Sequence, residues 1–69
     1  MNEDNKFRFD LWLYNQMQKY GYNAVDVADK TGISPQTINH YLRDTRMPTL
    51  RTLAVLLKAF NMHLEIVEN

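Results

Sequence analysis

The stretch ISPQTINHYLRDTRMP, from Ile33 to Pro48, contains the side chains of this sequence best suited to binding another molecule. If a helix follows Ser34, Gln36 and His40 lie four positions apart and share one face. Amide and imidazole groups on such a face form hydrogen bonds, and the arginines that follow supply positive charge. The stretch therefore predicts either a reader of nucleic acid or, more simply, one helix of a small bundle.

Charge is distributed unevenly along the chain, although the net charge at pH 7 is zero. From residue 30 to residue 51 there are four basic residues and one acid, which leaves +3, and the rest of the chain carries −3. The four basic residues are Lys30, Arg43, Arg46 and Arg51. This split predicts one basic face beside the polar helix, and random placement of surface charge is the simpler alternative.

Other chemistry has little support in the sequence. The 69 residues include no cysteine, which excludes disulfides and thiolate sites. His40 and His63 belong to different predicted elements, and a metal site needs more ligands than either offers. We expect no enzyme activity, no cofactor and no metal. Because no apolar stretch approaches the ~20 residues that span a membrane, we expect a soluble protein, and the lack of cysteine agrees with a reducing cytoplasm.

Two short helices with a tight turn between them are expected to carry the polar face. Asn23 and Ser34 are good N-caps, and Pro35 suits a first helical position, where its missing N–H costs nothing. Gly32, between the two helices, permits a left-handed backbone, and Ile38 is expected to pack inward. This geometry exposes the start of the second helix, which then fits the ~12 Å major groove of B-DNA.

A longer helix is expected on either side of this pair. Apolar residues three and four positions apart predict the first over about residues 8–20, with Gly21 as its end. Thr49 caps the other, over about residues 50–60. The stripe predicted to be buried on that helix comprises Leu50, Leu53, Ala54, Leu57 and Phe60, thickened by Val55 and Leu56.

The end of the chain alternates between apolar and polar residues, which predicts a strand. Its predicted dimer-interface residues are Met62, Leu64 and Ile66. A lone strand needs a partner, either the segment KFRF at residues 6–9 or the same strand of a second copy. The chain is thus expected to have three parts: a flexible tail (1–6), a helical domain (7–61) and a C-terminal strand (62–69).

From about residue 13 to 62 the sequence resembles the Cro/C1-type, or XRE-like, helix-turn-helix proteins. The resemblance rests on the joint order and spacing of Val27-Ala28, Gly32-Ile33-Ser34, Thr37-Ile38, the turn reaching Pro48, and PTLRTLAVLLKAF. It implies an all-α, lambda-repressor-like bundle of four to five helices, to which the sequence adds the C-terminal β-strand. It also implies binding to operator DNA, usually as a dimer on two-fold related half-sites.

The resemblance places the family's base-reading positions on Pro35, Gln36 and His40, with Asn39 close by. Gln36 can bridge N6 and N7 of adenine, and His40 can donate to guanine N7 or to a phosphate. Pro35 departs from the family pattern, because it has no side-chain donor and offers only apolar contact, for example to a thymine methyl. For His40 the alternative is an exposed polar residue without a ligand.

Contacts to the DNA backbone are expected from places that flank the reading helix. The residues are Asn23, Ser34, Thr37, Arg43, Arg46 and Arg51. Ala24 stands where family members often carry Gln, so either Asn23 and backbone amides replace that contact or the affinity for DNA is lower. For the arginines, solvated surface charge is the alternative interpretation.

Two functions agree with these features. The first is a sequence-specific transcriptional regulator, a repressor that binds a palindromic operator as a dimer. The second is the antitoxin of a toxin–antitoxin pair, because some small proteins of this family join the bundle to a C-terminal strand and bind a toxin as well as DNA. The sequence alone does not separate the two, nor does it decide between the strand and a surface near Trp12 for the dimer.

Overall fold

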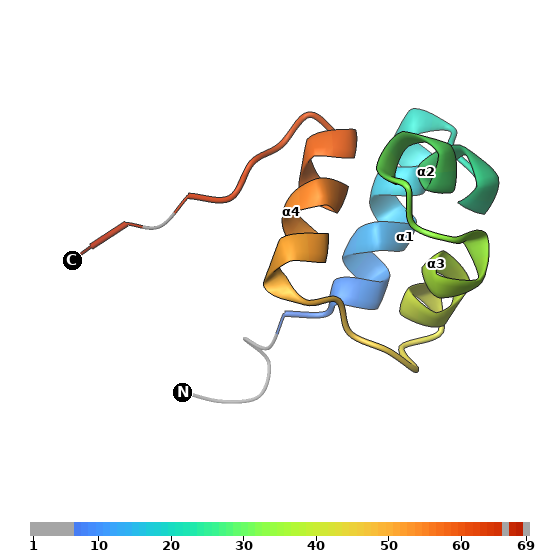
Figure 1. The fold of residues 1–69 in the computed structure, drawn as a ribbon, viewed down its shortest axis with the longest axis horizontal. Coiled ribbons are helices and arrows are strands. Elements are labelled where there is room, and N and C mark those ends of the chain that lie inside the picture. Colours follow the sequence, from blue (N-terminus) through green and yellow to red (C-terminus); the bar gives the residue numbers. More distant parts are fainter. Residues whose placement is uncertain (1–6, 66, 69) are drawn as a thin grey trace.

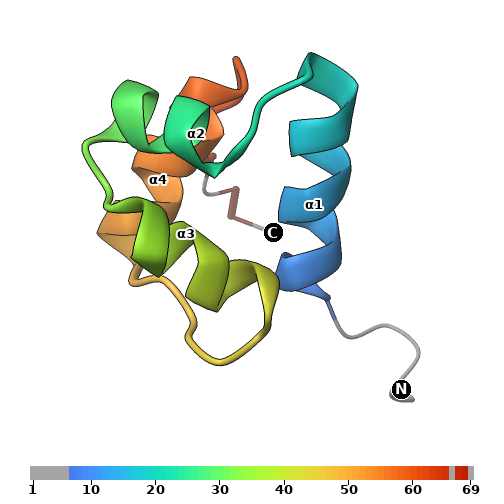
Figure 2. The ribbon, with the colours of Figure 1, turned by 90° about the vertical axis from the view of Figure 1, so that its right-hand side faces the viewer.

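The computed structural model describes residues 7–65 and 67–68, and within them the chain forms four α-helices. They are α1 (Phe9–Tyr20), α2 (Ala24–Thr31), α3 (Pro35–Leu42) and α4 (Leu50–Ala59), arranged as in Figure 1. α3 packs against α1 and α2, and α2 also packs against α4. Figure 2 shows α2 and α3 toward the viewer, with α4 behind them. The prediction of four helices is confirmed, and none of those described is long and apolar enough to cross a membrane.

Side-chain caps mark where α2, α3 and α4 begin. Asn23 Oδ1 accepts a hydrogen bond from the Asp26 N–H at 2.8 Å, and the Asp26 carboxylate accepts from the Asn23 N–H at 2.9 Å. This reciprocal pair is a capping box. Ser34 Oγ accepts from the Thr37 N–H at 3.1 Å, and Thr49 caps α4 in the same way. The three predicted N-caps are therefore confirmed.

The helix ends follow from residues in the left-handed conformation. Gly21 and Gly32 have φ of 70° and 78°, values that cost glycine little because it has no Cβ. Asp44 and Asn61 adopt φ of 59° and 63° after α3 and α4, and their short polar side chains tolerate this region better than most. Paired hydrogen bonds around Gly21, Asp44 and Asn61 close three of these ends as Schellman motifs. The predicted stops at Gly21 and Asn61 are confirmed.

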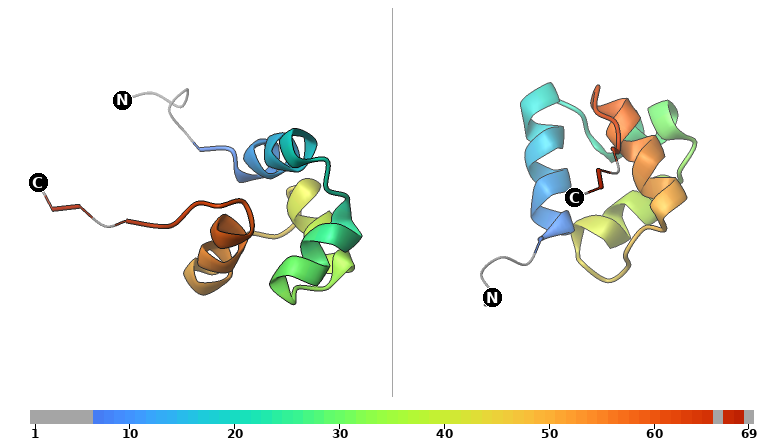
Figure 3. Two further views of the ribbon diagram at one scale, coloured as in Figure 1. Left: turned by 90° about the horizontal axis from the view of Figure 1, so that it is seen from above. Right: turned by 90° about the vertical axis from the view of Figure 1, so that its left-hand side faces the viewer.

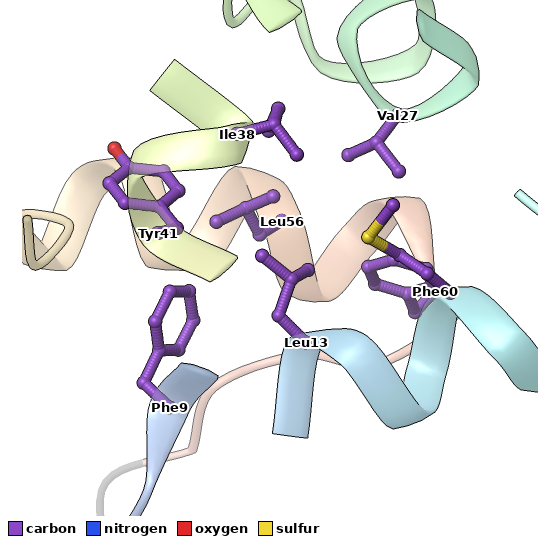
Figure 4. Packing of buried hydrophobic residues seen from close by; sticks show 8 residues of the cluster. Phe9, Leu13, Val27, Ile38, Tyr41, Leu56 and Phe60 are labelled. Carbon is purple, nitrogen blue, oxygen red and sulfur yellow. The ribbon is translucent and has the colours of Figure 1, made fainter. Parts of the chain in front are cut away.

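The core lies where the four helices meet (Figure 4). Eight of the described residues are buried there: Phe9, Leu13, Met17, Val27, Ile38, Tyr41, Leu56 and Phe60. The ring of Phe9 meets Tyr41 edge-on, with centroids 5.6 Å apart, and so joins the start of α1 to α3. Trp12 stacks on Phe9 at 5.8 Å and meets Phe60 edge-on, also at 5.8 Å. Trp12 therefore covers the edge of this core.

The prediction for the buried face of α4 is wrong in part. Leu56, expected only to thicken the stripe, is completely buried, and Phe60 is buried as expected. Leu50 is 64% exposed, Ala54 is exposed as well, and Leu53 is half-buried. Most positions of α4 are themselves apolar, so helical periodicity does not decide which of several overlapping faces is buried. Packing in the core, where Leu56 and Phe60 join buried side chains of the other three helices, makes that choice.

The predicted C-terminal β-strand is not seen. Residues 62–65 and 67–68 have no strand conformation, and they leave the bundle on the side away from α2 and α3 (Figure 3). Residues 7 and 8 of the proposed N-terminal partner have no strand conformation either, and Phe9 begins α1. A strand requires a paired backbone, and no such pair exists within the described residues. The predictions for Ile66 and for the tail at 1–6 fall outside those residues.

Candidate nucleic-acid interface

The outer face of α3 carries the four side chains predicted to read bases. Pro35, Gln36, Asn39 and His40 are all exposed. With 3.6 residues per turn, these positions fall on one side of the helix, whereas Ile38 and Tyr41 on the other side are buried. The structure therefore brings the four together, and we call Pro35, Gln36, Asn39 and His40 the polar face of α3.

The connection from α2 to α3 holds this face outward. Val27 of α2 and Ile38 of α3 are both fully buried, and they point into the same part of the core (Figure 4). Between them, Gly32 ends α2 at a φ of 78°. Thr31 Oγ1 donates to the Val27 carbonyl at 2.7 Å and accepts from the Ile33 N–H at 3.1 Å. These bonds fix the turn, and with it the side of α3 that remains exposed.

Polar groups gather at the start of both helices. Ser34 Oγ and Thr37 Oγ1 lie 2.9 Å apart at the N-terminus of α3, where Ser34 is exposed and Thr37 is half-buried. Asn23, at the start of α2, uses Oδ1 in its cap and keeps its exposed amide NH₂ for other partners. Helix N-termini favour anions through their free N–H groups and dipole. Both starts therefore suit phosphate oxygens.

Three arginines lie around the end of α3 and the start of α4. Arg43 immediately follows α3, Arg46 lies in the next loop, Arg51 lies on α4, and all three are exposed. Within the described residues they make no ion pair, whereas Arg8 pairs with Asp10 at 2.9 Å. The hydrogen bond between these two side chains lowers the pKa of the Asp10 carboxyl and raises the pKa of the Arg8 guanidinium. The charge of Arg8 is therefore balanced, while those of the three arginines are available.

Lys30, the remaining basic residue of the positive segment, lies in a different environment. Its Nζ is 4.8 Å from the ring centre of Tyr22, a cation–π contact. It also lines a surface pocket together with Asp26 and Asp29. Lys30 therefore has acidic and aromatic neighbours on α2 and before it, and we do not group it with the arginines.

One contact on the polar face has no counterpart in the sequence analysis. His40 Nδ1 lies 2.9 Å from Thr45 Oγ1, and the same oxygen donates to the His40 carbonyl at 3.1 Å. The Schellman motif at Asp44 explains this contact, because the Thr45 N–H bonds back to the His40 carbonyl at 3.0 Å. In the sequence, the one hint of this contact is Asp44, because aspartate tolerates the left-handed conformation that the turn requires.

Comparison with known proteins agrees with this geometry. A helix-turn-helix family model matches residues 13–67, a range that includes α2, the Gly32 turn and α3. The chain belongs to the Cro/C1-type helix-turn-helix family. The resemblance found in the sequence is thereby confirmed, and this Cro/C1-type protein is a DNA-binding transcription regulator. No curated protein and no solved structure matches the chain.

Proposed function

We propose that this Cro/C1-type protein is a sequence-specific repressor that binds a palindromic operator as a homodimer. The observation that carries the proposal is the exposed polar face of α3, next to three arginines without an ion pair in the described structure. Specific binding needs hydrogen-bonding groups that reach base edges and positive charges that anchor phosphates. The hydrogen-bonding groups lie on α3, and the three arginines follow it in the loop and at the start of α4.

Within the polar face, each side chain has its own suitable partner in the major groove. Gln36 suits adenine, whose N6 and N7 its amide can bridge, and Asn39 offers the same pair of groups. Pro35 suits the methyl group of thymine, since it presents only apolar atoms. The proposed phosphate contacts come from Asn23, Ser34, Thr37, Arg43, Arg46 and Arg51. A repressor acts in this scheme by covering its operator.

The segment after α4 supports the proposal of a dimer. Leu64 and Val67 are 44% and 74% exposed, and the segment extends away from the bundle (Figure 3). We propose that two copies pair these segments through Met62, Leu64 and Ile66 about a two-fold axis. Each segment would then supply the backbone partner that the other lacks. On a palindrome the two α3 helices would lie about 34 Å apart, one turn of DNA.

The same exposed segment favours a second candidate, an antitoxin. Apolar side chains that project from a folded domain can bind a different protein as readily as a second copy. In that case the protein would neutralise a toxin and repress its own operon. Co-expression with the neighbouring open reading frame tests this candidate. A stable complex of two different chains would favour the antitoxin, and a homodimer alone would favour the simple repressor.

Selection of bound duplexes from a random pool, at about 100 mM salt, tests the main proposal. A sequence-specific dimer should enrich a palindrome with half-sites about 10 base pairs apart. The enriched duplex should bind at least ~1,000-fold more tightly than a scrambled one. Equal affinity for the two duplexes would refute the proposal, while an enriched single half-site would refute only the dimer.

A further inference from the structure

The ring of His40 is held from one side by the loop that follows α3. Thr45 Oγ1 lies 2.9 Å from His40 Nδ1 and donates to the His40 carbonyl oxygen at 3.1 Å. Both residues are exposed, so the ring edge that carries Nε2 is not needed for the fold. A side chain held in this way differs from a free surface histidine, because one ring nitrogen already has a partner.

The hydroxyl group of Thr45 has only one proton, and the direction in which that proton points sets the state of the ring. When that proton points to the His40 carbonyl, Oγ1 can meet Nδ1 only as an acceptor, so Nδ1 must carry hydrogen. The reverse arrangement would leave two oxygens 3.1 Å apart with no proton between them. In a neutral imidazole a protonated Nδ1 leaves Nε2 as an acceptor.

We propose that Thr45 is a positioning residue for base recognition: it fixes the Nδ1–H form of His40, which then selects a base with an exocyclic amino group. This inference rests on the proposed function. In the major groove, N4 of cytosine and N6 of adenine are donors, whereas N7 and O6 of guanine and O4 of thymine are acceptors. Neutral His40 therefore accepts from cytosine or adenine, and the donation to guanine considered from the sequence would require hydrogen on Nε2, as in the opposite neutral form or the imidazolium.

The second histidine of the chain provides an internal comparison. His63 Nε2 lies 3.4 Å from an oxygen of the Glu65 carboxylate, and both side chains are exposed. A carboxylate accepts hydrogen bonds, so this contact favours hydrogen on Nε2. The two rings of one protein should therefore show opposite preferences.

Long-range ¹⁵N–¹H correlation spectra of the full chain test the ring state without DNA. At pH 8, above the range in which histidine ordinarily titrates, His40 should show the Nδ1–H pattern and His63 the Nε2–H pattern. Thr45→Ser should keep the His40 pattern, since the hydroxyl remains, and Thr45→Val should abolish it. An Nε2–H pattern for His40, or an unchanged pattern in Thr45→Val, would overturn the inference.

Competition between operator duplexes tests the consequence for base choice. The base pair read by His40 is the one whose preference disappears in His40→Ala. The wild type and Thr45→Ser should favour cytosine or adenine there by about 2- to 10-fold, the value of one hydrogen bond. Thr45→Val should show less than ~2-fold preference. A preference for guanine, or one that Thr45→Val keeps, would overturn this inference while operator binding continued. Failure to bind any duplex selectively would instead overturn the proposed function.

Discussion

Replacement of Gln36 by alanine should reduce the sequence specificity of DNA binding, whereas replacement of Arg46 should reduce the affinity for every duplex. Both side chains are exposed, so each substitution should change the free energy of unfolding by less than about 0.5 kcal/mol. Gln36 belongs to the polar face of α3, and we expect it to read a base. Arg46 lies in the loop after α3 without an ion pair in the described residues, and we expect it to bind a phosphate.

The size of each effect follows from these positions. Removal of one bidentate pair of hydrogen bonds between Gln36 and adenine should reduce discrimination at one base pair by about 1–3 kcal/mol, or about 5- to 150-fold. Arg46→Ala should flatten the slope of log affinity against log salt by about 0.9 for each phosphate that the protein no longer neutralises, hence about 1.8 for a dimer. The ratio of wild-type affinity to Arg46→Ala affinity should therefore be about 12-fold smaller at 200 mM salt than at 50 mM salt.

Fluorescence anisotropy measures both quantities on the same duplexes. The selected operator, an operator changed at one base pair of one half-site, and a scrambled duplex should be titrated at several salt concentrations. Lys58→Ala is the matched control, because Lys58 is exposed near the C-terminal end of α4. It removes one positive charge as Arg46→Ala does, but away from the polar face of α3.

Three results would contradict this reasoning. If Gln36→Ala weakens operator and scrambled duplex equally, Gln36 does not read a base. If Arg46→Ala keeps the salt slope of the wild type, or if Lys58→Ala flattens it as much, the expected phosphate anchor is wrong. A change of about 0.9 in place of 1.8 would mean that one copy binds each duplex.

Other predictions concern the dimer and the stability of the domain. Truncation after Asn61 should give a monomer in sedimentation, as should Leu64→Asp in the full chain, and a dimer of unchanged strength would place the interface elsewhere. Leu56→Ala should lower the free energy of unfolding in urea by about 2–5 kcal/mol, whereas Val55→Ala, at a position 38% exposed, should cost much less. Equal destabilisation by the two would contradict the buried face assigned to α4. Ser34→Ala should cost about 1 kcal/mol because it removes the cap of α3, and Ser34→Gly only a few tenths; equal stability of the alanine variant would refute that role.

The sequence predicted the features that depend on near neighbours along the chain. Asn23, Ser34 and Thr49 cap helices through bonds to amides three residues away, so their types and positions were sufficient. Gly21 ends α1 because its backbone adopts the left-handed conformation there. The sequence also predicted that Gln36 and His40 share one side of α3, because they lie four positions apart, whereas Pro35 and Asn39 were assigned to the reading surface by the family resemblance. Their exposure agrees with a reading surface, and their role in DNA binding stays a prediction.

Only the tertiary structure decided the features that depend on partners distant in the chain or on the path of a loop. Leu56 became the buried centre of α4 because its side chain lies among the core side chains of the other helices (Figure 4), although several apolar faces of α4 were equivalent in sequence. Thr45 lies next to His40 because the chain turns back at Asp44. The spacing of apolar residues along the sequence does not reveal such a turn. The segment from Met62 has the alternation of a strand, but hydrogen bonds to a second backbone make a strand. Alternation alone cannot supply that partner.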